Sequence, residues 1–199
     1  MLRDLADTLK SLMYVDLNDP NSTEKLINEQ NIIFKSPADI DSENPNGGTI
    51  PTQLSIFLYQ IVQNSFLRNS EWEPVGLDKM QNPPLALDLY YLFTPYASDK
   101  DTEFILLEKI MTCFYDNAVL KGSILKGSLP TTGNDEIRIV PHSFSFDEIN
   151  KLWERFPNKP FKLSLAYLIS PVRIPSDKTE SITRVTERII DFNRIGDQK

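Results

Sequence analysis

Cysteine and histidine, which build many catalytic and metal sites, each occur once in this 199-residue chain. A single cysteine, Cys113, cannot form an internal disulfide, and this usage fits folding in a reducing compartment. Cys113 lies among apolar residues of a predicted helix, so we interpret it as a small buried hydrophobic residue rather than a nucleophile. The lone His142 has no second histidine or cysteine at a ligand spacing. The sequence therefore predicts no metal site and no cofactor.

Long apolar runs and clusters of positive charge are also missing. No stretch approaches the ~18 consecutive apolar residues of a membrane helix, so no membrane insertion is expected. The net charge of −7 argues against nucleic-acid binding, which needs a basic face. Asp4 and Asp7 interrupt the apolar residues at the N-terminus, unlike a signal peptide. We expect a protein that is cytosolic when made, which leaves export as part of a particle open.

Motifs for catalysis are absent as well. Asp147 and Glu148 are neighbours on a predicted helix and point in different directions, so they do not form an acid/base pair. The glycine-containing stretch 121–128 lacks the spacing of a phosphate-binding loop. Asp88 is the one polar residue that interrupts an apolar strand. The sequence predicts a protein that is not an enzyme, with a small-molecule enzyme using Asp88 and nearby tyrosines as an alternative.

Two similar strands are the strongest positive signal. Residues 84–95 and 160–171 each run from proline to proline with apolar residues at alternating positions, the side-chain period of a half-buried strand. Because proline cannot donate to a sheet ladder, we expect pairing to begin and end at these prolines. The residues taken as the signature of the two strands are Leu85, Leu87, Asp88, Leu89, Tyr91, Leu163, Leu165 and Tyr167.

Helical periodicity predicts three helices. The first, from Leu2 to Met13, is amphipathic, and its apolar stripe covers either the protein's own core or a partner. The second lies within 99–120, with Asp99 or Asp101 as its cap and an apolar stripe at Phe104, Leu107, Ile110, Met111 and Phe114. The third, 145–156, begins with the capping-box pattern of Ser145 and Glu148.

The remaining chain completes an α+β fold. Residues 31–35, 54–64 and 136–142 are predicted strands, and 65–81 is a predicted connector in which Trp72 anchors on the core. With an apolar fraction of 40% and a charged fraction of 25%, the composition is that of a globular protein. We therefore expect a mixed β-sheet of about four to five strands flanked by about three helices, with an extended C-terminal arm.

The division of the chain follows its composition. Residues 1–171 are predicted to form a single domain, and 172–199 a polar C-terminal arm. Within the arm, residues 182–192 are rich in β-branched residues and favour a strand that pairs with its own sheet or with another subunit. The candidate interface residues are Ile182, Arg184, Val185, Thr186, Glu187, Arg188, Ile189 and Ile190.

Several of these stretches together resemble a known family. The core Pro83-Pro-Leu-Ala-Leu-Asp-Leu-Tyr-Tyr-Leu, the helix containing Leu106-Leu-Glu-Lys-Ile-Met, the stretch Lys162–Val172, the strand beginning Ser55-Ile-Phe-Leu-Tyr, and Val185-Thr-Glu-Arg carry the likeness. They are similar to the cap, or tail-terminator, proteins of extracellular contractile injection systems, which are phage-tail-like particles. The resemblance covers about residues 1–192.

The resemblance implies a non-enzymatic structural subunit. It implies a homo-hexameric ring at the end distal to the baseplate, where the inner tube and contractile sheath stop growing, so the expected partners are further copies of the chain, sheath protein and inner-tube protein. The alternative is an adaptor module that forms no ring and binds one partner through its N-terminal helix or C-terminal arm. The mass of the complex would discriminate the two.

Overall fold

The computed structural model describes residues 1–18, 25–40, 51–68, 71–76 and 78–182. Contacts divide the chain into two compact units, one of Met1–Asn69 with Pro84–Pro175 and one of Ser70–Pro83 with Ser176–Lys199. The architecture is α+β, as predicted. None of the described helices is long and apolar enough to cross a membrane.

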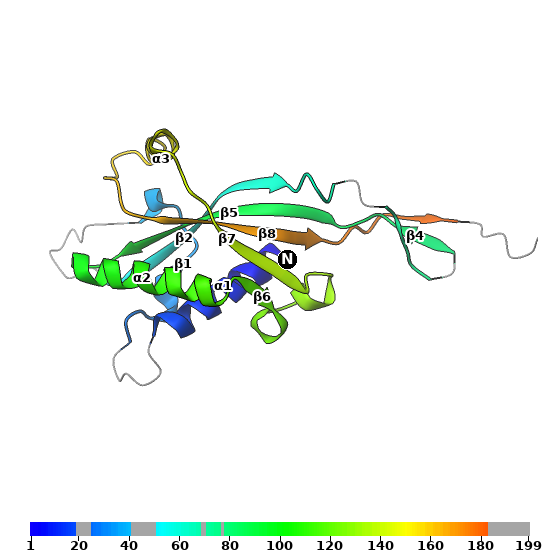
Figure 1. The fold of residues 1–199 in the computed structure, drawn as a ribbon, viewed down its shortest axis with the longest axis horizontal. Helices are drawn as coiled ribbons and strands as arrows, with labels where there is room; N and C mark the ends of the chain where they lie inside the picture. The colour runs from blue at the N-terminus through cyan, green and yellow to red at the C-terminus, as the bar shows by residue number, and fades with distance from the viewer. Residues whose placement is uncertain (19–24, 41–50, 69–70, 77, 183–199) are drawn as a thin grey trace, which may run out of the picture. The chain divides into compact units, whose positions relative to one another are not determined.

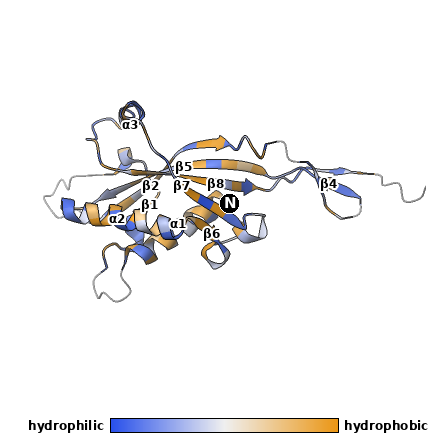
Figure 2. Ribbon diagram, viewed as in Figure 1, coloured by the Kyte–Doolittle hydropathy of each residue, from blue (hydrophilic) through white to orange (hydrophobic). Residues whose placement is uncertain are grey.

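A six-stranded mixed sheet forms the larger unit, with strand order β1-β2-β5-β8-β7-β6. Its strands are β1 (Ile32–Ile33), β2 (Gln53–Gln63), β5 (Leu85–Tyr96), β6 (Val119–Lys121), β7 (Glu136–Pro141) and β8 (Leu165–Ile174). Only β1 and β2 pair in parallel, and the other pairs are antiparallel. The predicted strands β5 and β8 are neighbours at the centre of the sheet, and β5 is mostly hydrophobic in Figure 2.

Three α-helices flank the sheet: α1 (Leu2–Leu17), α2 (Lys100–Asp116) and α3 (Phe146–Trp153). In Figure 1, α1 and α2 lie on one side of the six-stranded sheet and α3 on the other. Short 3₁₀ turns lie at Glu29–Asn31, Pro37–Asp39, Gly122–Ile124 and Leu129–Thr131. The predicted caps are present, because the Asp99 side chain accepts from the Thr102 N–H at 2.7 Å and Ser145 and Glu148 form the capping box.

The N-terminal helix covers the protein's own core. Leu5, Leu9, Met13 and Leu17 recur every four residues along α1, and each is fully buried. They join a cluster that includes Phe93, Ile137 and Ile169 from β5, β7 and β8. Because its apolar stripe is used in this way, α1 offers no comparable stripe to a partner, which removes one support for the adaptor alternative.

The buried face of α2 differs from the predicted stripe. Leu106, Leu107, Ile110, Cys113 and Phe114 are buried, whereas Phe104 and Met111 are about half exposed. The buried positions are spaced by three and four residues around Ile110, so the core-facing stripe is rotated by about one position from the expected one. Phe104 and Met111 therefore do not belong to the buried face of α2.

The second repeated strand begins later and ends later than predicted. β8 starts at Leu165 and continues past Pro171 to Ile174. Leu87 pairs with Val172 and Leu89 with Ile169, so Ser170 and Pro171 together oppose the single residue Asp88. This arrangement is a β-bulge, in which proline is tolerated because it need not donate to the ladder. Proline therefore does not end the strand here.

Leu163 lies outside β8, contrary to its assignment to the strand. Its neighbour Lys162 turns inward to pair with Glu103, and successive side chains of an extended segment point in opposite directions. Leu163 is consequently 55% exposed. Ser164, the next residue, hydrogen-bonds through its hydroxyl to Thr94 at 2.8 Å.

The smaller unit contains a three-stranded antiparallel sheet of order β3-β4-β9, with β3 (Glu73–Pro74), β4 (Lys79–Gln81) and β9 (Thr179–Ser181). The connector prediction for 65–81 missed β3 and β4. Trp72 packs beneath the Lys178 ammonium, 5.3 Å from its ring centroid, within this unit. Its predicted anchoring on the main core is therefore wrong.

Candidate assembly interface

The single cysteine and the single histidine both pack against other parts of the fold. The Cys113 thiol is buried in α2, and burial, followed by the nearby Asp16 carboxylate, raises its pKa. The His142 ring packs edge-on against Tyr90 and Phe144, at centroid distances of 5.1 and 5.0 Å. Among the described residues, no group of three or more His, Cys, Asp or Glu could hold a metal ion.

Asp88 belongs to a polar network at the β8 bulge. Its Oδ1 accepts a hydrogen bond from the Asn64 amide at 2.8 Å and another from the Ser170 hydroxyl. Asn64 is almost fully buried, and its Nδ2 also donates to Ser170 at 3.4 Å. The network joins the chain just after β2 to β5 and β8, so Asp88 holds the bulge in place.

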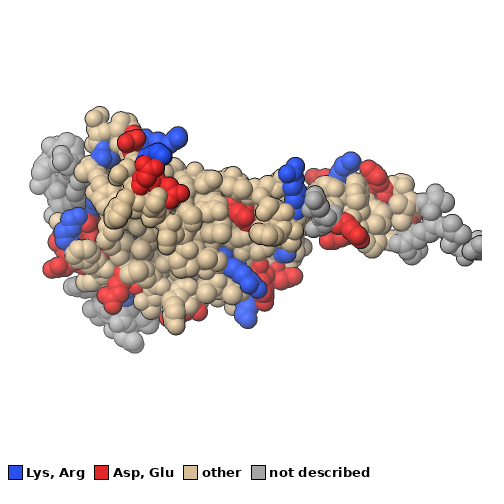
Figure 3. Space-filling model, turned by 45° about the horizontal axis from the view of Figure 1, so that its top comes forward, with Lys and Arg blue, Asp and Glu red and all other residues tan. Residues whose placement is uncertain are grey.

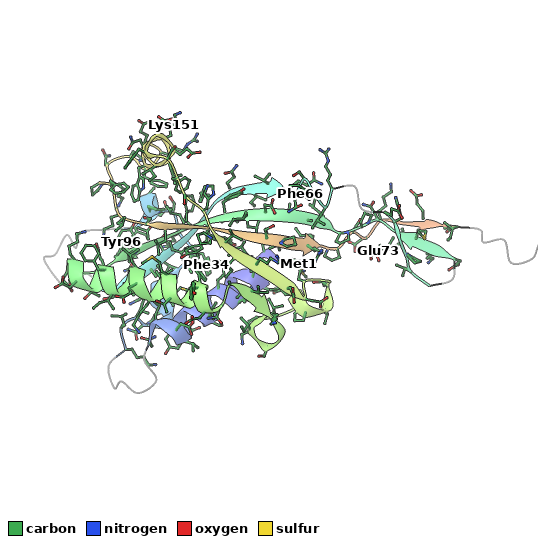
Figure 4. All side chains as sticks on the ribbon, in the orientation of Figure 1. Met1, Phe34, Phe66, Glu73, Tyr96 and Lys151 are labelled. Atoms are coloured by element: carbon green, nitrogen blue, oxygen red, sulfur yellow. The ribbon has the colours of Figure 1, made fainter. Side chains whose placement is uncertain are left out.

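The same Asn64 side chain organises the turn that follows β2. Its Oδ1 accepts hydrogen bonds from the backbone N–H groups of Phe66 and Leu67, at 3.0 and 3.1 Å. This local capping directs Phe66 outward, where it is 94% exposed (labelled in Figure 4). A large aromatic side chain held in solvent by a buried network is a candidate contact residue, and sequence reasoning did not identify it.

The end of β2 also carries exposed apolar side chains, which alternate between the two faces of the sheet. Ile61 and Val62 are 50% and 38% exposed, and no charged residue occurs anywhere in the 11-residue strand. We name Ile61, Val62 and Phe66 the β2 strip. Figure 3 shows a broad area of the larger unit that carries few charged side chains, with lysine, arginine and acidic residues gathered mainly around it.

A second apolar surface lies on α2. Phe104, Met111 and Tyr115 share one helix face at spacings of seven and four residues, and Tyr115 is 85% exposed. We name these residues the α2 stripe. Beside it is a groove of about 580 Å³, lined by Met111 and Tyr115 from α2 and by Pro141, Phe144, Ile149 and Leu165. Exposed apolar surfaces of this kind mark sites of protein contact.

A partly buried ion pair fixes the start of α2. Glu103 binds Lys162 through Oε1 and Lys100 through Oε2, the second at 2.7 Å, and accepts from the Ala97 N–H at 3.4 Å. Burial alone would raise the pKa of Glu103, but the hydrogen bonds from Lys100 and Lys162 outweigh it and hold the pKa below its ordinary value. The pair ties α2 to the segment that leads into β8.

The structure brings most of the signature residues together. Leu87, Leu89, Tyr91 and Tyr167 are buried, Leu165 is partly buried and packs against the core, and Leu85 at the start of β5 is exposed. Of the predicted interface residues, only Ile182 is described, and its backbone N–H donates to the Asp78 carbonyl at 2.8 Å. Arg184, Val185, Thr186, Glu187, Arg188, Ile189 and Ile190 lie outside the described residues.

The sequence matches the family described as the Pvc16 N-terminal domain over residues 4–188. Among solved structures, the chain is similar to one described as the PVC sheath/tube terminator of an extracellular contractile injection system in the extended state. The TM-score is 0.69 at 18% identity, covering 100% of this chain and 65% of that one.

A second similar structure is the anti-feeding prophage cap, described as a tube-terminating cap. Its TM-score is 0.66 at 19% identity, covering 96% of this chain and 62% of that one. At these identities the likeness shows a shared fold, and the chain spans less than two thirds of each solved chain. None of the curated proteins compared matches the sequence.

Proposed function

The chain belongs to the Pvc16 N-terminal domain family, and from this membership we propose that it is a structural cap subunit of a phage-tail-like contractile injection particle. In this role it forms a ring, of six copies by the resemblance, at the end distal to the baseplate. There it stops growth of the inner tube and the sheath. The subunit assembles in the cytosol, leaves only with the particle, and needs neither catalysis nor a cofactor.

The observation that carries this proposal is the fold correspondence with a sheath/tube terminator over 100% of this chain. A similar fold with the tube-terminating cap of a second particle covers 96% of it. Both of those proteins are described as terminators. Extending their role to this chain is the proposal, and it agrees with the structural surroundings of Asp88 and Cys113.

Ring closure requires two different surfaces on each subunit, since a cyclic assembly uses a heterologous contact. The larger unit presents two separate groups of exposed apolar side chains, the β2 strip and the α2 stripe. We assign the ring contact to these surfaces together with the C-terminal arm, whose candidate residues are Ile182 and Arg184–Ile190. Main-chain pairing by the arm would supply affinity with little demand on side-chain fit.

Electron microscopy of particles from cells carrying the whole gene cluster tests the proposal. With the gene deleted, we expect particles of uncontrolled length or with frayed ends, and restoring the gene should restore uniform length. Capped particles of normal length without the gene would remove the terminator role. A soluble one-to-one complex with a single partner protein would then favour the adaptor alternative.

A further inference from the structure

The sheet of the larger unit has one long unpaired edge. β1 pairs only with Leu54 and Ser55 of β2, whereas β2 continues to Gln63 alongside β5. In the described part of the chain, Ile56–Gln63 therefore have a strand on one side only. Phe34, Lys35 and Ser36 lie beside Ile56–Leu58, so the exposed part of this edge is Gln60–Gln63, roughly 13 Å at the ordinary rise per residue. A bulge at Tyr59 interrupts the register with β5 and leaves Gln60–Gln63 as a regular, exposed segment.

Backbone geometry shows which groups this edge presents. Asn64 donates its N–H to the Ala86 carbonyl of β5 at 2.9 Å. In an antiparallel ladder the N–H and C=O of one residue point the same way, and successive residues alternate. Val62 thus faces β5, and Ile61 and Gln63 direct their backbone groups to the open side.

Apart from the bulge at Tyr59, the edge lacks the usual protection against pairing. Natural edge strands are blocked by charge or proline, or are very short, and β2 carries neither a charged residue nor a proline. The other terminal strands of the two sheets, β1, β3, β6 and β9, have two or three residues each. By length and charge, β2 is the described edge best suited to accept another strand.

The same chain contains a segment suited to pair with the open edge of β2. The described residues end at Ile182, just after β9, and 17 residues follow. Of these, residues up to Phe192 continue a sequence rich in β-branched side chains. The eleven residues from Ile182 are more than enough to span the exposed edge Gln60–Gln63. The segment also carries Arg184, Glu187 and Arg188, so the new outer edge would be charged and would resist further addition.

We propose that Ile182–Phe192 of one copy adds as a strand to the open edge of β2, at Gln60–Gln63, in a neighbouring copy. This inference rests on the proposed function, because it describes how neighbours in the cap ring are joined. Each copy gives one strand and receives one, which is the head-to-tail contact that a closed ring needs.

Photo-cross-linking in cells that make the complete particle tests the pairing. The full-length chain carries a benzophenone amino acid in place of Ile61, with Phe146, 87% exposed on α3, as the control position. Irradiation at position 61 is expected to give covalent dimers whose cross-linked peptide lies within 182–192, and position 146 should not label that peptide. Cross-links from position 61 to any other peptide or protein, or no dimer from particles that contain the chain, would overturn the proposal.

A charge variant gives an independent readout. Ile61→Lys places a charge on the open edge and should lower the fraction of particles that carry the chain by at least about fivefold. Ile105→Lys makes the same change at a similarly exposed position, 45% against 50%, and should leave that fraction within about twofold. If the Ile61→Lys particles are capped and of normal length, the strand pairing is wrong while the terminator role stands. Normal particles in the gene deletion would instead refute the role itself.

Discussion

Asp88 and Asn64 show how a buried polar side chain can define a surface without taking part in chemistry. The Asp88 carboxylate receives hydrogen bonds from Asn64 and Ser170 at the bulge, and Asn64 in turn holds the turn that exposes Phe66. An aspartate within an apolar strand suggested a reactive group in the sequence. Its contacts instead make it an acceptor that keeps three segments of chain in register.

Substitutions of Asp88 test its role as a hydrogen-bond acceptor. Asp88→Ala leaves the Asn64 amide and the Ser170 hydroxyl without their acceptor, which should lower the free energy of unfolding by about 2 kcal/mol. Asp88→Asn keeps an acceptor oxygen and should cost less than about 1 kcal/mol. Urea denaturation of both variants measures the difference, and equal losses would contradict the acceptor role.

The ion pair of Glu103 makes stability depend on pH. Because the folded pKa of Glu103 is below its ordinary value of 4.5, its contribution is complete above that value and is lost as the pH falls through the folded pKa. We expect Glu103→Gln to be less stable than the natural chain at pH 7 by about 2 kcal/mol, and the gap to close at low pH. Urea denaturation from pH 7 to pH 3 measures this gap. A difference that stays constant over the range would show that Glu103 acts by packing alone.

Elements with sustained periodicity were predictable from the sequence, and of the short strands only β1 was predicted, within 31–35. α1, α2, α3, β2, β5 and β7 follow from periods of 3.6 or 2 and from cap residues. β3, β4, β6 and β9 have only two or three residues, too few to show a period. The position of β8 depends on a bulge fixed by Asp88 and Asn64, and the Asn64–Ser170 contact spans 106 residues, so no local pattern could reveal it.

α3 is stabilised mainly by the hydrogen bonds that cap its N-terminus. None of its residues is buried, and the capping box joins the Ser145 hydroxyl to the Glu148 N–H at 3.3 Å and the Glu148 carboxylate to the Ser145 N–H at 2.9 Å. A helix with so little packing should open locally rather than with the whole domain.

Removing the cap should therefore have a local effect. Ser145→Ala is expected to cost α3 about 1 kcal/mol, which corresponds to roughly fivefold faster amide exchange in residues 146–153. Exchange in β5 and β8 should be unchanged. Hydrogen–deuterium exchange read by mass spectrometry resolves these segments, and equal acceleration in β5 would show that the cap stabilises the whole domain.

At the scale of the whole molecule, a folded α+β unit carries two groups of exposed apolar side chains and a C-terminal segment with the composition of a strand. These are the parts that a ring subunit requires. The division of the chain into a domain of 1–171 and an arm of 172–199 stays a prediction, and its functional content can be tested directly.

Deleting residues 176–199 tests the arm. The deletion should leave the larger unit folded, because α1, α2 and the six-stranded sheet all lie within Met1–Asn69 and Pro84–Pro175. Ring and particle-end assembly should be lost, because the neighbour's sheet edge receives no strand. Circular dichroism confirms folding, and electron microscopy counts capped ends. Particles capped as efficiently as those with the full chain would exclude the arm from assembly.

The central claim is that this chain caps the particle, and cryo-electron microscopy of the particle end distal to the baseplate tests it most directly. The account predicts a closed ring at that end, in which density for the six-stranded sheet with α1 and α2 on one side repeats in each subunit. Density for this fold at another place on the particle, or an end with no ring of this fold, would contradict it.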